Sequence, residues 1–150
     1  MLWDALLAWF HYLSIFLLVA AQAAQAVLLR PGLAAATVRR LAFYDRIYGV
    51  AALAVLASGA LRVTLGAKGA AFYLHNPWFH AKIAVYVLVA LCSIAPTVAY
   101  LRWNRQARRH QVRVPDDTAV RGVRRWVLAE IHLLVLLPLL AALMARGYGL

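Results

Sequence analysis

Residues 123–146, VRRWVLAEIHLLVLLPLLAALMAR, decide the fold of this protein. Apart from Glu130 and His132, the run between its basic ends is apolar. About 20 helical residues cross the roughly 30 Å hydrocarbon core of a bilayer, so this run is long enough to span a membrane. Lipid tolerates no unpaired backbone groups, and a helix pairs them within one segment. The run therefore predicts a transmembrane helix.

Three further apolar runs of similar length precede it along the chain. They cover Leu2–Leu29, Leu41–Val63 and Pro77–Trp103. Turn-forming residues separate the four runs: Arg30-Pro31-Gly32, the segment with Gly66 and Gly69, Asn76-Pro77, and an Arg-rich stretch that contains Pro115-Asp116-Asp117. Four runs are too few to close a β-barrel. We therefore expect an all-α fold, an integral membrane four-helix bundle that forms a single domain over residues 1–150.

The composition also favours a bilayer environment. Of the 150 residues, 65% are hydrophobic and only 14% are charged, and the mean hydropathy is +0.74. One small soluble domain cannot enclose so many apolar side chains. Cys92 is the single cysteine and lies inside an apolar run, which excludes a disulfide scaffold and a Cys-rich structural zinc site.

Basic residues are concentrated on one side of the expected bundle. The chain has 16 Lys and Arg against 5 Asp and Glu, a net charge of +11. Twelve arginines flank one side of the four runs: Arg30, Arg39, Arg40, Arg46, Arg102, Arg105, Arg108, Arg109, Arg113, Arg121, Arg124 and Arg125. The other side has four basic residues: Arg62, Lys68, Lys82 and Arg146. The positive-inside rule therefore predicts that both termini lie outside the cytoplasm, as in a multi-pass protein of the bacterial inner membrane.

The Arg-rich stretch from Asn104 to Arg121 has two interpretations. A basic loop beside membrane helices orients the protein and contacts anionic lipid headgroups. Nucleic-acid binding is the alternative, but the position of the arginines between apolar runs favours lipid. We expect no nucleic-acid partner.

Polar residues recur at helical spacing within the runs. The shared faces carry His11, Ser14, Gln22 and Gln25 in the first run, Asp45, Tyr48 and Gly59 in the second, and Lys82, Tyr86, Ser93, Thr97 and Tyr100 in the third. Arg62 lies at the outer end of the second run. A charged side chain costs on the order of 3 kcal/mol at a helix centre in lipid, so these faces are expected to point into the bundle. Glu130 and His132 lie about 200° apart around the last helix, so both cannot face the bundle axis.

His11 is the first candidate ligand. Counting about 1.5 Å per residue from the ends of the runs places His11 and His132 within about 5 Å of each other in depth, where they could pair on facing helices. Membrane bundles of four helices hold haem through histidines, because neutral imidazole is a good axial ligand and the macrocycle fits between helices. Lys82 would be a second ligand if neutral, or a partner for a propionate or an acidic substrate if charged. In the alternative interpretation, His11 and Lys82 only form hydrogen bonds between helices.

Three features of the chain resemble a known family. They are Trp78-Phe79-His80-Ala81-Lys82 at the start of the third run, His11 preceded by an aromatic residue, and Glu130 early in the fourth run. Together they look like the HemJ-type protoporphyrinogen oxidases. The chain is also similar to copper-resistance D-type domains and to small bacterial four-helix membrane families known only as domains of unknown function. It departs from the HemJ pattern at Ile131-His132, where that family tends to have a proline.

The resemblance implies a cofactor and an activity. HemJ-type proteins bind haem b through a first-helix histidine and depend on a third-helix lysine, roles that fall on His11 and Lys82. They oxidise protoporphyrinogen IX to protoporphyrin IX and form oligomers. By the same resemblance, we expect a porphyrin-like or other lipid-soluble substrate and a homo-oligomer.

A mechanism for such a protein assigns roles to further residues. Either Lys82 or His132 would be the second axial ligand of the iron, and Arg62 would help to hold a porphyrin carboxylate. Glu130 and Asp45 would move protons while electrons pass through haem to a quinone-like acceptor.

Three other functions fit the same pattern. A bis-histidine cytochrome would use His11 and His132 for electron transfer alone. A small membrane transporter, for example for metal uptake, would need a continuous polar path, and the two methionines provide no thioether ladder for copper. A structural membrane subunit would use the polar faces only for helix packing.

Overall fold

The structure, a computed structural model, describes residues 2–110 and 115–148. Within these residues the chain forms helices and no strand: α1 (Leu2–Leu28), α2 (Ala35–Leu65), α3 (Gly69–Leu74), α4 (Pro77–His110) and α5 (Asp117–Ala145). All but the short α3 are long and apolar enough to cross a membrane, which confirms the prediction of an all-α fold with four helices of membrane-spanning length and hydropathy. Among the arginines expected on one side, Arg113 lies outside the described residues, and so does the side chain of Arg109.

The spanning helices extend beyond the apolar runs. The additional helical segments are 35–40 in α2, 104–110 in α4 and 117–122 in α5. These segments contain arginines and other polar residues that are compatible with a helix but not with an apolar run, so hydropathy alone misses them. The Asp116 carboxylate caps α5, because it accepts a hydrogen bond from the Ala119 backbone N–H at 2.9 Å.

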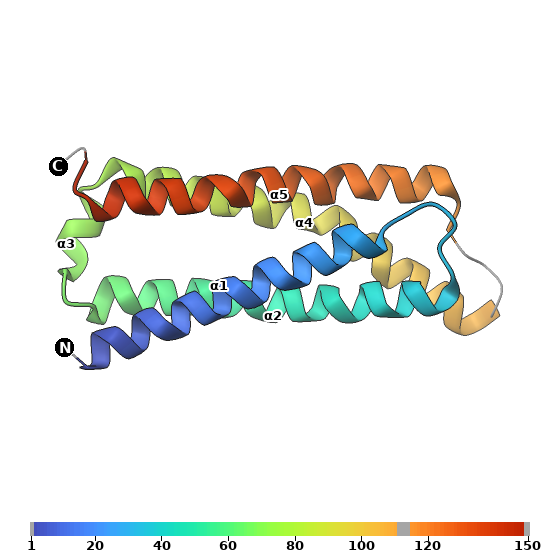
Figure 1. The fold of residues 1–150 in the computed structure, drawn as a ribbon, viewed down its shortest axis with the longest axis horizontal. Helices are drawn as coiled ribbons and strands as arrows, with labels where there is room; N and C mark the ends of the chain where they lie inside the picture. The colour runs from blue at the N-terminus through green and yellow to red at the C-terminus, as the bar shows by residue number, and fades with distance from the viewer. Residues whose placement is uncertain (1, 111–114, 149–150) are drawn as a thin grey trace.

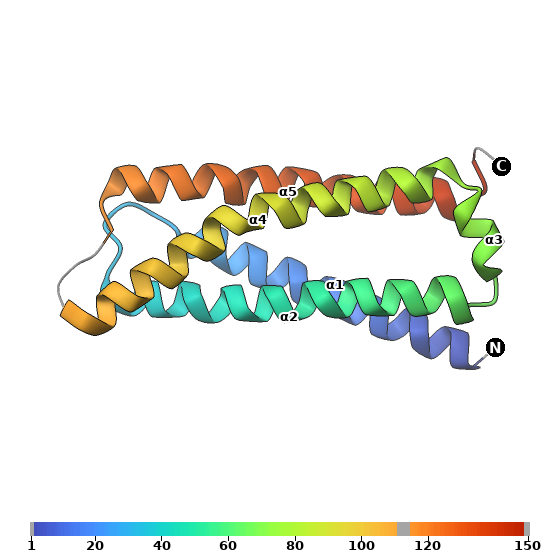
Figure 2. The same ribbon diagram turned by 180° about the vertical axis from the view of Figure 1, so that it is seen from behind.

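The four long helices form two antiparallel pairs (Figure 1). α1 packs along α2 and α4 packs along α5, whereas the contacts between the pairs are fewer and join mainly α2 to α4 and α1 to α5. The pairs lie farther apart at the end where α3 crosses from one to the other, and α1 approaches α5 only towards the opposite end (Figures 1 and 2). The start of α1 and the end of α5 both lie at the α3 end.

The end opposite α3 is the arginine-rich end, and the hydrophobic core is concentrated in that half. Its largest cluster of buried side chains includes Leu29, Val38, Leu41, Tyr100, Trp103, Val120 and Val127. Two hydrogen bonds tie the pairs together there. Arg124 Nη1 donates to the Leu29 carbonyl at 2.7 Å, and the Gly32 backbone N–H donates to Asp117 Oδ1 at 2.9 Å. The bundle is thus closed at the arginine-rich end.

Candidate functional site

A cavity of about 320 Å³ lies at the α3 end, and all five helices line it. The lining side chains that matter below are His11, Arg62, Tyr73, Lys82, Tyr86 and Met144. The walls are mainly apolar and aromatic with a few polar groups, and the volume falls within the roughly 300–1,000 Å³ range of small-molecule sites. The separation of the two helix pairs therefore produces a site that can hold a ligand inside the bundle.

A hydrogen bond to α2 fixes the orientation of His11. The side chain is only 5% exposed, and its Nδ1 lies 2.8 Å from Ser58 Oγ. The Ser58 hydroxyl donates its own hydrogen to the Ala54 carbonyl at 2.6 Å, so it accepts from His11 Nδ1–H. A proton on Nδ1 leaves a free lone pair on Nε2. Metal-ligating histidines are typically anchored through the other ring nitrogen in this way.

Gly59 lies against the His11 imidazole on the wall of the cavity. A Cβ at this position would lie 3.5 Å from His11 Cε1, an ordinary van der Waals contact. Because Gly59 also lines the cavity, any larger side chain at this position would extend into the space beside His11. The absence of a side chain at Gly59 thus keeps the cavity open.

Two cationic side chains share the cavity with His11. Arg62 and Lys82 both line it, and each lies close enough to His11 to act on it electrostatically. The Arg62 guanidinium also lies over the Tyr12 ring, 5.6 Å from its centroid, in a cation–π contact. Of the described residues that line the cavity, none is acidic. The charge of the cavity therefore suits an anionic ligand.

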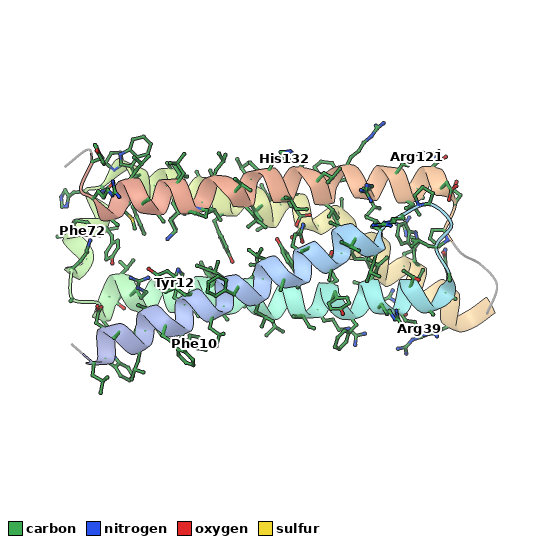
Figure 3. The ribbon with its side chains drawn as sticks, in the orientation of Figure 1. Phe10, Tyr12, Arg39, Phe72, Arg121 and His132 are labelled. Carbon is green, nitrogen blue, oxygen red and sulfur yellow. The ribbon has the colours of Figure 1, made fainter. Side chains whose placement is uncertain are left out.

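His132 does not lie near His11. Its side chain is exposed on the outer side of α5 (Figure 3), and its Nδ1 donates to the Leu128 carbonyl at 2.6 Å. Gln22 contacts Glu130 at 3.1 Å, so this part of α5 is level with Gln22, and His132 lies about 13 Å along the bundle from His11. The pair that the depth count allowed is not formed, because Glu130 faces inward and the helical period turns His132 outward. Counting from the ends of apolar runs also gave the wrong register.

Glu130 and Asp45 lie in a second buried group that does not line the cavity. Gln22 Nε2 donates to Glu130 Oε2 at 3.1 Å, and Thr97 Oγ1 donates to Asp45 Oδ1 at 2.9 Å. Gln22 lies about 16 Å beyond His11 along α1. Of the residues singled out in the sequence, the structure brings His11, Arg62 and Lys82 together and separates Glu130 and Asp45 from them.

Sequence reasoning missed two residues of the cavity region, Ser58 and Met144. Ser58 is the only polar side chain between Tyr48 and Arg62, and this isolation within an apolar stretch was a signal for an inward-facing hydroxyl. Met144 is the α5 residue that lines the cavity together with His11, and it is 9% exposed. Nothing in the sequence distinguishes Met144 from an ordinary apolar residue near the end of a helix.

The chain belongs to the family described as "Predicted membrane protein (DUF2214)", whose model matches residues 3–149. This match agrees with the expectation of a membrane family known only as a domain of unknown function. No curated protein and no solved structure matches the chain.

Proposed function

We propose that this protein is a haem b-binding membrane redox protein in which His11 is a ligand of the iron. The observation that carries the proposal is the hydrogen bond from His11 Nδ1 to Ser58. It leaves the Nε2 lone pair of a buried, cavity-lining histidine without a hydrogen-bond partner among the described residues. An imidazole in this state is suited to an axial position on haem.

The other groups of the cavity suit the remaining parts of a haem. Arg62 would pair with a propionate, and the aromatic walls would pack against the macrocycle. If Lys82 is charged, the second iron ligand would be the Met144 thioether, because methionine is a known partner of histidine on haem iron, whereas a neutral Lys82 amine would itself be that ligand. Bound haem would supply a one-electron couple.

The resemblance to HemJ-type proteins extends the proposal to a substrate. A porphyrinogen would use one of its carboxylates to bind a charged Lys82, and a quinone-like molecule in the membrane would accept the electrons. Porphyrin fluorescence after addition of protoporphyrinogen IX to membranes measures this activity. Lys82→Met is expected to reduce the rate at least tenfold, whereas equal rates for wild type and vector-only membranes would overturn this part of the proposal.

We also propose that the arginine-rich end lies on the cytoplasmic side of a bacterial inner membrane, against anionic lipids. The support is the positive-inside rule applied to the arginines of the two loops at that end. A cysteine-reactive, membrane-impermeant label is expected to modify a cysteine added after Leu150 in intact cells. Labelling only after lysis would contradict this orientation.

A reduced-minus-oxidised absorbance spectrum of the purified protein tests haem binding. After haem-replete expression, wild type is expected to give the Soret and α bands of haem b, and His11→Ala is expected to lose them. His132→Ala is the matched control, because His132 is exposed and bonded to its own helix. Absence of a Soret band in wild type would overturn the proposal, and an unchanged spectrum in His11→Ala would overturn the assignment of the ligand.

The geometry gives less support to the other functions. The distance between His11 and His132 does not suit a bis-histidine cytochrome that uses this pair. For bare metal ions, the described residues contain no group of three His, Cys, Asp or Glu side chains that could hold one. The cavity and its cations therefore favour an anionic organic cofactor.

A further inference from the structure

A second group of polar side chains is buried between the helix pairs, separate from the cavity. We name it the acid cluster: Gln22 and Gln25 of α1, Asp45 and Tyr48 of α2, Thr97 and Tyr100 of α4, and Glu130 of α5. Each spanning helix contributes at least one member, and the two hydrogen bonds described above join α1 to α5 and α2 to α4. The two carboxyl groups lie near each other, and the Tyr48 and Tyr100 rings lie near both.

Several polar atoms of the acid cluster have no protein partner. Glu130 Oε1, Gln22 Oε1, Gln25 Nε2 and the Tyr100 hydroxyl are buried and make no hydrogen bond to the described residues. These side chains are no more than 2% exposed. A buried polar atom without a partner costs about 1–3 kcal/mol, so the unpartnered oxygens of Glu130, Gln22 and Tyr100 point to a bound species that satisfies them.

The charges of the acid cluster point to the same conclusion. Asp45 and Glu130 are two of the five acidic residues of the chain, and both face the interior of the bundle. The basic residues nearest in sequence do not face the acid cluster, because Arg46 and Arg125 are exposed and Arg124 donates to the last carbonyls of α1. The facing groups from all four helices are amides, hydroxyls and carboxyls. Two carboxylates in this position require a compensating positive charge.

We propose that the acid cluster is a binding site for a monovalent cation, either a proton carried with water or Na⁺. Asp45 and Glu130 supply the charge, and the free oxygens of Gln22 and Tyr100 supply neutral ligands. A shared proton would join the two carboxyls through water, which would also satisfy the unpartnered atoms. Na⁺ would use the same oxygens directly. The site depends on neither haem nor His11.

Infrared spectroscopy of the purified protein distinguishes a proton from Na⁺. In Na⁺-free buffer near neutral pH, wild type is expected to show the carbonyl stretch of a protonated carboxylic acid. Glu130→Gln and Asp45→Asn are each expected to remove it. Asp117→Asn is the matched control, because Asp117 begins α5 at the surface and is expected to keep the band. Tyr100→Phe is expected to shift its frequency, since the lost hydroxyl changes the hydrogen bonding.

Addition of NaCl, compared with KCl, completes the test. A carbonyl band that neither salt changes identifies a bound proton. A carbonyl band that NaCl reduces and KCl does not identifies Na⁺. A rise in Tm that is specific to Na⁺ and is lost in Glu130→Gln also identifies Na⁺. Absence of the band in wild type together with no Na⁺-specific change in Tm would overturn the proposal. His11→Ala is expected to keep the band, so failure of haem binding and failure of this site are distinguishable.

Discussion

Replacement of Ser58 by alanine tests how His11 is prepared for a ligand. Ser58→Ala removes the hydroxyl that accepts the hydrogen bond from His11 Nδ1–H. The distance from Nδ1 to Ser58 Oγ is 2.8 Å, and the His11 side chain is only 5% exposed. Leaving a buried N–H without a partner costs about 1–3 kcal/mol. Loss of such an anchoring group typically weakens metal binding about 10–100-fold. At 1.4 kcal/mol per factor of ten, this loss equals about 1.4–2.8 kcal/mol, which agrees with the hydrogen-bond value.

Two measurements check this prediction. Titration of the haem-free protein with haem, followed by Soret absorbance, gives the Kd, which is expected to rise about 10–100-fold in Ser58→Ala. Independently of haem, ¹⁵N chemical shifts of labelled histidine report which ring nitrogen of His11 carries the proton. We expect Nδ1–H in wild type and a mixture of tautomers in Ser58→Ala.

Ser93→Ala is the control for the loss of a helical serine. The Ser93 hydroxyl donates to the Ala90 carbonyl of its own helix at 2.8 Å, as Ser58 does to Ala54, but Ser93 does not line the cavity. Equal haem affinities for Ser58→Ala and Ser93→Ala would refute the reasoning. So would a wild-type His11 that carries its proton on Nε2.

Three further predictions concern cavity volume and stability. Gly59→Leu is expected to abolish haem binding because the new side chain fills the cavity, whereas normal binding would contradict the assignment of this cavity. Gly66→Ala is expected to lower the free energy of unfolding in detergent by about 1–3 kcal/mol, because the new Cβ would overlap a backbone oxygen of α2. Its control is Gly122→Ala, where a Cβ would have no atom within 4 Å; this variant is expected to raise the free energy of unfolding by about 0.5–1 kcal/mol. Arg124→Met is expected to cost about 1–3 kcal/mol through loss of its bonds to the last carbonyls of α1, and an equal loss in the exposed Arg125→Met would contradict that role.

Hydropathy was sufficient to predict the spanning helices, because lipid requires long apolar segments with internal hydrogen bonds. Helical spacing also predicted which faces point inward: His11, Ser14, Gln22 and Gln25 are all buried, as the first-run pattern requires. The short helix α3 was not expected, since the glycines around it predict only a break in the chain. Turn-forming residues in the sequence do not indicate a helix as short as α3, which is stabilised by packing across the end of the bundle.

The site was harder to predict, because pairing between helices depends on tilt and register. The period of one helix places Glu130 inward and His132 outward, yet no spacing within the sequence indicates that Gln22 rather than His11 lies level with Glu130. The same limit applies to Met144, which reaches the cavity only through the register of α5. Sequence patterns identify the facing side of each helix, but only the packed bundle determines which inward residues meet.

The two helix pairs are also the first and second halves of the chain in order of synthesis. A ribosome completes the α1–α2 hairpin before it makes Thr97 and Glu130, the partners of Asp45 and Gln22. During that interval an acidic side chain and an amide have no partner from the second half, at a cost of several kcal/mol if they face lipid. Arrival of the α4–α5 hairpin supplies the missing partners and buries both groups. The order of translation therefore gives the second hairpin a polar attraction, in addition to apolar packing, for docking onto the first.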